Sequence, residues 1–200
     1  MLTLMGFAQL RLFLVVGFHA FPDFIQGGFI GVDIFFVISG YLISTIIFKK
    51  LEAGSFSFTA FYIRRVLRIF PALLVVLLSF LILGWFTLLG DEYMQLGQHV
   101  TAGIGFVSNF RLWSEVGYFD NAAETKPLLH LWSLAIEEQF YIAWPLIVWC
   151  AWKARISTFA IICALAVGSF YLNLKGVATY PSATFYLPLS RFGNCFVEAY

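Results

Sequence analysis

Charged side chains are scarce in this sequence: Asp, Glu, Lys and Arg together make up 12% of its 200 residues. A soluble domain typically contains about 25% charged residues and about 45–50% apolar ones. Here 61% of the residues are hydrophobic, and the mean hydropathy is +0.87. This balance excludes an ordinary soluble globular domain and predicts an integral membrane protein built mainly from transmembrane helices.

Cysteine is also rare, and there is little excess charge of either sign. Cys150, Cys163 and Cys195 lie far apart and form no C-x-x-C pair, so the sequence indicates neither a disulfide framework nor a zinc site. The net charge of +1 gives no basic surface of the kind that binds nucleic acid. We therefore expect no metal, no bound cofactor and no nucleic-acid partner.

Long hydrophobic runs, in contrast, are abundant. A helix needs about 20 apolar residues to cross the hydrocarbon core of a bilayer. We expect spans over residues 4–20, 29–48, 69–89, 128–152 and 156–174, and the start of another at Leu187. Residues 21–28 predict a turn, and Pro71 is expected in the first turn of the third span. The apolar segment 99–113 is too short to be assigned as a span. The predicted fold is an all-α polytopic bundle of about five to six spans, in one domain over residues 1–200.

The charges between the runs predict the orientation in the membrane. Basic residues gather between the second and third expected spans and again between the last two, and these residues are Lys49, Lys50, Arg64, Arg65, Arg68, Lys153 and Arg155. By the positive-inside rule both loops face the cytoplasm. The amino terminus is then cytoplasmic as well, and residues 90–126, which include five acids, face outward.

Polar residues at membrane depth are costly and by default mark function. His130, Ser133, Glu137 and Tyr141 are spaced 3, 4 and 4 apart, which places them on one face of the fourth long helix, with Glu138 beside them. A buried carboxylate needs a cationic or hydrogen-bonding partner, or it takes up a proton. The alternative interpretation is a structural tie between helices.

A histidine and an aspartate flank the first predicted turn. His19 lies near the outer end of the first span and Asp33 near the outer start of the second. A carboxylate that accepts from one imidazole nitrogen makes the other a better base, whereas a lone histidine near a membrane interface is more often a polar cap. Arg11 lies roughly 12 Å deeper than His19 and must face protein or water.

A pair of arginines lies directly before the third expected span, on the side predicted to face the cytoplasm. Arg65 and Arg68 are three residues apart, which places two guanidinium groups on one helical face. Such a fork suits phosphates. The alternative is the ordinary accumulation of positive charge on the cytoplasmic side.

Five stretches of the chain resemble the amino-terminal half of the bacterial acyltransferase 3 membrane family. They occur in the order of the family and read LVVGFHAFP, GGFIGVDIFFVISGYLIS, FYIRRVLRIFPALL, SNFRLWSEVGYFD and PLLHLWSLAIEEQFYIAWPL. The resemblance implies a multi-pass inner-membrane enzyme that O-acylates, commonly O-acetylates, a cell-surface glycan. It implies acyl-CoA, such as acetyl-CoA, as the donor held on the cytoplasmic side, and an acceptor hydroxyl on the outer side.

The resemblance also assigns roles to residues. His19 matches the essential histidine of the family, Arg11 is the candidate for the arginine before it, and Arg65 and Arg68 match its R-x-x-R motif. The acidic pair after the W-S-L motif corresponds to Glu137 and Glu138. The implied mechanism is general-base acyl transfer by His19 with Asp33 as its orienting partner, or a covalent acyl-histidine variant. The implied donor site contains Arg11, Arg65 and Arg68, and Glu137 and Glu138 join His19 and Asp33 as candidate catalytic residues. The shared helical face makes His130, Ser133 and Tyr141 candidate acceptor-binding residues.

Some features depart from the family pattern. Arg11 and His19 are separated by fewer residues than is usual, and the stretch LPLSRF near the end continues differently from its family counterpart. We therefore expect a domain that is incomplete at its carboxyl terminus and at its amino terminus, with about half of a roughly ten-span bundle. Two other functions stay open: an inactive truncated remnant or non-catalytic membrane partner, and a transporter-like protein.

Overall fold

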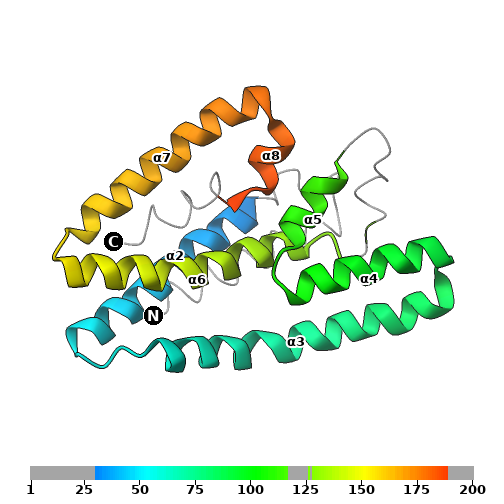
Figure 1. The fold of residues 1–200 in the computed structure, drawn as a ribbon, viewed down its shortest axis with the longest axis horizontal. Helices are drawn as coiled ribbons and strands as arrows, with labels where there is room; N and C mark the ends of the chain where they lie inside the picture. The colour runs from blue at the N-terminus through cyan, green and yellow to red at the C-terminus, as the bar shows by residue number, and fades with distance from the viewer. Residues whose placement is uncertain (1–29, 117–125, 127, 189–200) are drawn as a thin grey trace.

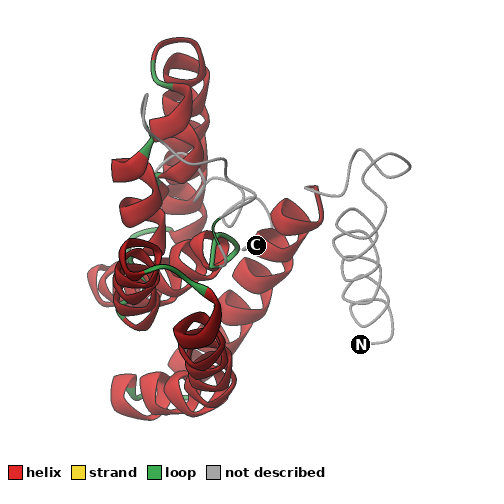
Figure 2. Cartoon of the chain, turned by 90° about the vertical axis from the view of Figure 1, so that its right-hand side faces the viewer, coloured by secondary structure: helices red, strands yellow, loops and turns green. Residues whose placement is uncertain are grey.

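The computed structural model describes residues 30–116, 126 and 128–188, and all regular structure in these ranges is helical (Figures 1 and 2). The helices are α2 (Ile30–Glu52), α3 (Phe58–Thr87), α4 (Gly90–Ile104), α5 (Ser108–Glu115), α6 (Leu131–Ala154), α7 (Thr158–Thr179) and α8 (Pro181–Tyr186). The all-α prediction is confirmed for this part of the chain. The expected span over residues 4–20, the turn at 21–28 and nearly all of the segment after Leu187 lie outside the described residues.

Helix α3 begins earlier than the hydrophobic run indicates. Gly54 adopts a positive φ of 64° in the connection after α2, and the Ser57 hydroxyl then caps α3 by accepting from the amide of Ala60 at 3.4 Å. The helix therefore includes the arginines that precede the apolar run. The expectation that Pro71 lies in the first turn is wrong, because Pro71 lies inside the helix.

Residues 99–113 form parts of two short helices and not one segment. Helix α4 ends at Ile104, and α5 begins at Ser108. Between them Phe106 adopts a positive φ of 51°, which a continuous helix cannot contain. Neither helix has the length of about 20 residues that a span requires.

The helices pack in pairs. Helices α3 and α4 run side by side as a hairpin, and α2 crosses α6 (Figure 1). Helix α5 contacts both α6 and α8, near the start of α6. Helix α7 diverges from α6 after a sharp turn at Arg155, which adopts a left-handed conformation.

Two hydrophobic clusters hold these pairs together. The larger one joins α2 to α6 and includes Phe36, Ile43, Ile136, Phe140 and Trp144 at its centre. The smaller one joins α3 to α4 through Leu73, Leu77, Leu96 and Val100, together with Leu128 before α6. The α2–α6 pair is thus the most deeply packed part of the described chain.

Two described helices are long and apolar enough to cross a membrane, namely α3 and the segment Phe159–Thr179 of α7. Only 11% of the apolar window of each is buried. A core helix of a soluble protein would be mostly covered, and large exposed apolar faces require an apolar environment. In length and composition these two helices agree with the spans expected over residues 69–89 and 156–174.

Candidate functional site

The α2–α6 interface positions the strongest group of buried polar side chains. On α2 the buried residues Phe36, Ser39, Ile43 and Ile47 are spaced 3, 4 and 4 apart, which is one helical face. On α6 the facing residues include Ile136, Phe140, Trp144 and Val148. Apolar packing along this length fixes which polar side chains meet in the middle.

A carboxylate lies at the centre of this interface. The Ser39 hydroxyl donates to Glu137 Oε1 at 2.8 Å, and the Tyr141 hydroxyl donates to the same oxygen. The exposed fractions are 8%, 5% and 4% for Ser39, Glu137 and Tyr141. The prediction that Glu137 and Tyr141 share a face is confirmed. Sequence reasoning missed Ser39; its spacing from Phe36 and Ile43 marks only that it lies on the buried face of α2.

A second polar contact fixes the register of the same two helices. The Trp144 indole nitrogen donates to the Ser44 hydroxyl at 2.8 Å. The Trp144 ring also stacks on Phe140, with centroids 5.7 Å apart and an interplanar angle of 16°. The stacking orients the indole within α6, and its hydrogen bond to Ser44 joins α6 to α2 in the register that places Ser39 opposite Glu137.

Helix α3 brings one arginine onto this cluster. Arg65 Cζ lies 4.1 Å from the centroid of the Tyr141 ring and 5.9 Å from that of Phe61. The Tyr62 hydroxyl donates to the carbonyl of Ile142 at 2.9 Å and anchors α3 on α6 at the same level. The structure therefore places Arg65 beside the residues of the predicted carboxylate site.

The remaining predicted residues of α6 differ in their surroundings. Glu138 is buried, and its Oε1 has no hydrogen-bond partner among the described residues. His130 is exposed just before the helix starts, and its carbonyl accepts from the Ser133 hydroxyl at 3.1 Å. His130 lies roughly 10 Å along the helix from Glu137, since each residue adds about 1.5 Å.

Three of the predicted site residues have no described side chain. His19 and Arg11 lie outside the described residues, and Asp33 lies in α2 without a described side chain. The predicted contact between His19 and Asp33 therefore stays a prediction. Among the described residues no group of three or more His, Cys, Asp or Glu could hold a metal ion.

The residue after the acidic pair connects α6 to a third element. The Gln139 amide donates to the carbonyl of Phe106 at 2.8 Å and to Asn109 Oδ1 at 2.9 Å. Asn109 is completely buried, and its amide donates to the carbonyl of Tyr186 at 3.0 Å. Helices α5 and α8 are thereby tied to α6 one residue from Glu138.

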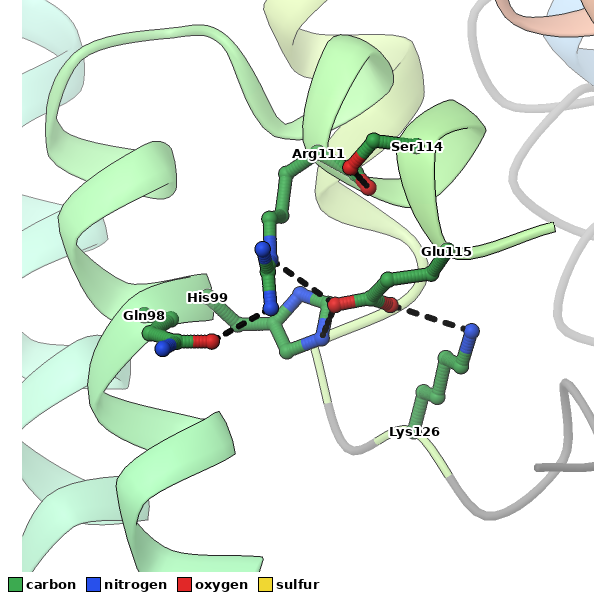
Figure 3. Close-up of polar contacts among 6 residues, drawn as sticks. All are labelled: Gln98, His99, Arg111, Ser114, Glu115 and Lys126. Atoms are coloured by element: carbon green, nitrogen blue, oxygen red, sulfur yellow. Dashed lines mark hydrogen bonds and ion pairs between the residues drawn. The ribbon is translucent and has the colours of Figure 1, made fainter. Parts of the chain in front are cut away.

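A separate charged cluster surrounds Glu115 at the end of α5 (Figure 3). Its Oε1 lies 3.1 Å from His99 Nε2 and 2.8 Å from Arg111 Nε, and its Oε2 lies 3.1 Å from Lys126 Nζ, so the carboxylate forms three ion pairs when His99 is protonated. Arg111 also donates to Gln98 Oε1. One carboxylate thus joins α4, α5 and the residues that precede α6. Sequence reasoning assigned no role to His99, because these contacts depend on how the helices pack.

This cluster predicts a pH dependence of stability. Burial lowers the pKa of His99 below its ordinary value of 6.5; Glu115 opposes this shift, while Arg111 and Lys126 add to it. As the pH falls below 6.5, His99 therefore takes up a proton more readily in the unfolded chain than in the folded chain. The contribution of His99 to stability is fully present above pH 6.5 and is lost as the pH decreases. Thermal unfolding in detergent between about pH 8 and pH 5 measures this effect.

The matched variant for this prediction is His99→Gln, which keeps an N–H donor for Glu115 but cannot be protonated. We expect the wild-type unfolding temperature to decrease more steeply than that of the variant as the pH falls. Equal slopes for the two proteins would show that His99 does not titrate differently in the folded state.

The sequence profile of the acyltransferase domain family matches residues 9–196 of the chain. A Haemophilus influenzae protein whose name states no activity is 39% identical over 156 residues, which are 77% of this chain and 62% of that protein. A Staphylococcus aureus (strain COL) protein, whose name proposes an O-acetyltransferase, is 41% identical over 72% of this chain and 24% of its own. The peptidoglycan O-acetyltransferase OatA of Listeria monocytogenes is 40% identical over 152 residues.

These alignments cover only part of the relatives. The matched segment is 62% of the Haemophilus protein and 24% of the Staphylococcus and Listeria proteins. The chain thus spans less than two thirds of the length of these relatives. No solved structure matches it.

Proposed function

Because the chain belongs to the acyltransferase domain family, we propose that it is a membrane O-acyltransferase that moves an acyl group from acyl-CoA to a glycan hydroxyl. The observation that carries the proposal is the buried Glu137 carboxylate, which accepts from Ser39 and Tyr141 inside an otherwise apolar helix pair. Ionisable groups in such positions are costly and by default serve function. The name of the Listeria relative, which states peptidoglycan O-acetylation, supports acetyl as the acyl group and an envelope glycan as the acceptor.

The proposed chemistry starts at His19. Its imidazole takes the proton from the acceptor hydroxyl, and the oxygen attacks the thioester carbonyl of the donor. The C–S bond then breaks, and the departing CoA thiolate takes the proton back from the imidazolium. Asp33 is the proposed partner that orients the imidazole, and the negative charge of Glu137 and Glu138 stabilises its protonated form.

The donor and acceptor are proposed to enter from opposite sides. Arg65 and Arg68 precede the apolar part of α3, and Arg68 is exposed, so phosphates of CoA can reach it. Arg11 completes the proposed donor site. His130 and Ser133 lie at the other end of α6 from Lys153 and form the proposed acceptor side with Tyr141 deeper in the helix.

The proposed location is the bacterial inner membrane. The positive-inside rule places the arginines of α3 and the amino terminus in the cytoplasm. The exposed apolar faces of α3 and α7 support insertion, and about five to six spans complete the proposed topology.

The test uses the whole chain in membrane vesicles of both orientations. Radiolabelled acetyl-CoA is added outside the vesicles, and label is measured in glycan that contains alkali-labile esters. We expect transfer in inside-out vesicles, where the arginines of α3 face the donor, and little in right-side-out vesicles. Label that enters the lumen without forming an ester would indicate a transporter, and an inserted but inert chain would indicate a remnant.

A further inference from the structure

Tyr141 is a point where three helices meet. It belongs to α6, and its hydroxyl donates to Glu137 Oε1, the oxygen that also accepts from Ser39 of α2. One face of its ring is covered by the guanidinium of Arg65 from α3, with Arg65 Cζ 4.1 Å from the ring centroid. Tyr141 as a whole is 4% exposed, so its side of this contact is shielded from solvent.

The two arginines of the R-x-x-R motif have different surroundings. Arg65 is half-buried between the rings of Tyr141 and Phe61. Arg68, three residues later on α3, is exposed and makes no ion pair or hydrogen bond within the described part of the chain. The sequence pattern treats the two as one fork, whereas the structure holds one in place and leaves the other accessible.

A guanidinium over an aromatic face is held there by the attraction between its positive charge and the negative face of the ring. Because the same ring carries the hydroxyl that donates to Glu137, fixing the ring also fixes that hydroxyl.

We propose that Arg65 is a positioning residue, which holds Tyr141 and through it Glu137, and that Arg68 is the arginine that contacts the phosphates of the acyl donor. This inference rests on the proposed acyltransferase function. It divides between two residues a task that the motif assigns to both, and it connects the donor side of α3 to the carboxylate of α6.

The division of roles is tested by steady-state kinetics with acetyl-CoA in vesicles. For Arg68→Ala we expect KM for acetyl-CoA to rise about tenfold with little change in kcat, because charge-assisted hydrogen bonds to phosphate are lost. For Arg65→Ala we expect kcat to fall about tenfold while KM stays within about twofold. The matched control is Arg64→Ala, which removes an exposed neighbouring arginine and should leave both parameters unchanged.

A double-mutant cycle tests whether Arg65 acts through Tyr141. Tyr141→Leu removes the ring face and the hydroxyl, so adding Arg65→Ala should lower kcat little further. The pair Arg68→Ala and Tyr141→Leu should instead be additive. If Arg65→Ala does not insert into membranes, Arg65→Lys takes its place, since lysine keeps the charge but lacks the planar guanidinium.

Direct binding of CoA separates failure of this inference from failure of the proposed function. We expect the wild type and the Arg65 variants to bind CoA alike and Arg68→Ala to bind it more weakly. If Arg65→Ala weakens CoA binding as much as Arg68→Ala, or its effect multiplies with that of Tyr141→Leu, the division of roles is wrong while the function stands. If the wild type neither binds CoA nor transfers acetyl, the proposed function fails and this inference fails with it.

Discussion

Replacing His19 with alanine is expected to lower acetyl transfer by about 10²–10⁴-fold, which is the contribution that a positioned general base typically makes. The acceptor hydroxyl is a weak nucleophile, and without a base it must lose its proton to water. Donor binding should persist, because the proposed contacts to CoA come from arginine side chains and not from His19. The measurement compares the initial rate of transfer and the binding of CoA in the same membranes.

His99 supplies a matched control for this prediction. His99→Gln alters the Glu115 cluster, which lies outside the proposed chemistry, and should leave the rate at neutral pH nearly unchanged. Trapped radiolabel on the wild-type protein that is absent from His19→Ala would indicate the acyl-histidine route. A His19→Ala protein with the full transfer rate would exclude both roles for this residue.

Replacing Glu137 with glutamine is expected to lower the transfer rate by about 10²-fold. Glutamine keeps the shape and an oxygen that can accept from Ser39 and Tyr141, so the helix packing should survive. The variant loses only the negative charge, which the proposed mechanism uses to stabilise the imidazolium. The effect should therefore appear in kcat, with the unfolding temperature nearly unchanged.

Two further variants show whether charge or packing causes the effect. Glu92→Gln changes an exposed residue, whose carboxylate accepts from the amide of Leu89 at the start of α4, and should not affect transfer. Ser39→Ala removes one donor to Glu137 and should have a small effect, about threefold, since polar contacts between membrane helices average about 0.6 kcal/mol. Full activity of Glu137→Gln would show that the carboxylate is only a structural tie between helices.

Local patterns predicted part of this site. The shared face of Glu137 and Tyr141 follows from helical spacing alone, and the structure confirms it. The span expected from residue 69 starts after the beginning of α3, because hydrophobicity marks the apolar core of a helix, whereas Ser57 and Gly54 mark its beginning. Capping residues were therefore the better guide to that boundary.

Contacts between helices could not be predicted from spacing. Ser39 meets Glu137 only because the apolar faces of α2 and α6 pack in one register. The stacking of Arg65 on Tyr141 likewise depends on the level at which α3 crosses α6. The same holds for Glu115, whose partners come from two helices and a residue before a third.

The most direct test measures alkali-labile acetyl on the envelope glycan of cells that express this chain, against the same cells without it. The account predicts that the ester content rises with the wild-type chain. An unchanged ester content, with the protein shown to be inserted in the membrane, would contradict the claim that this chain is an acyltransferase.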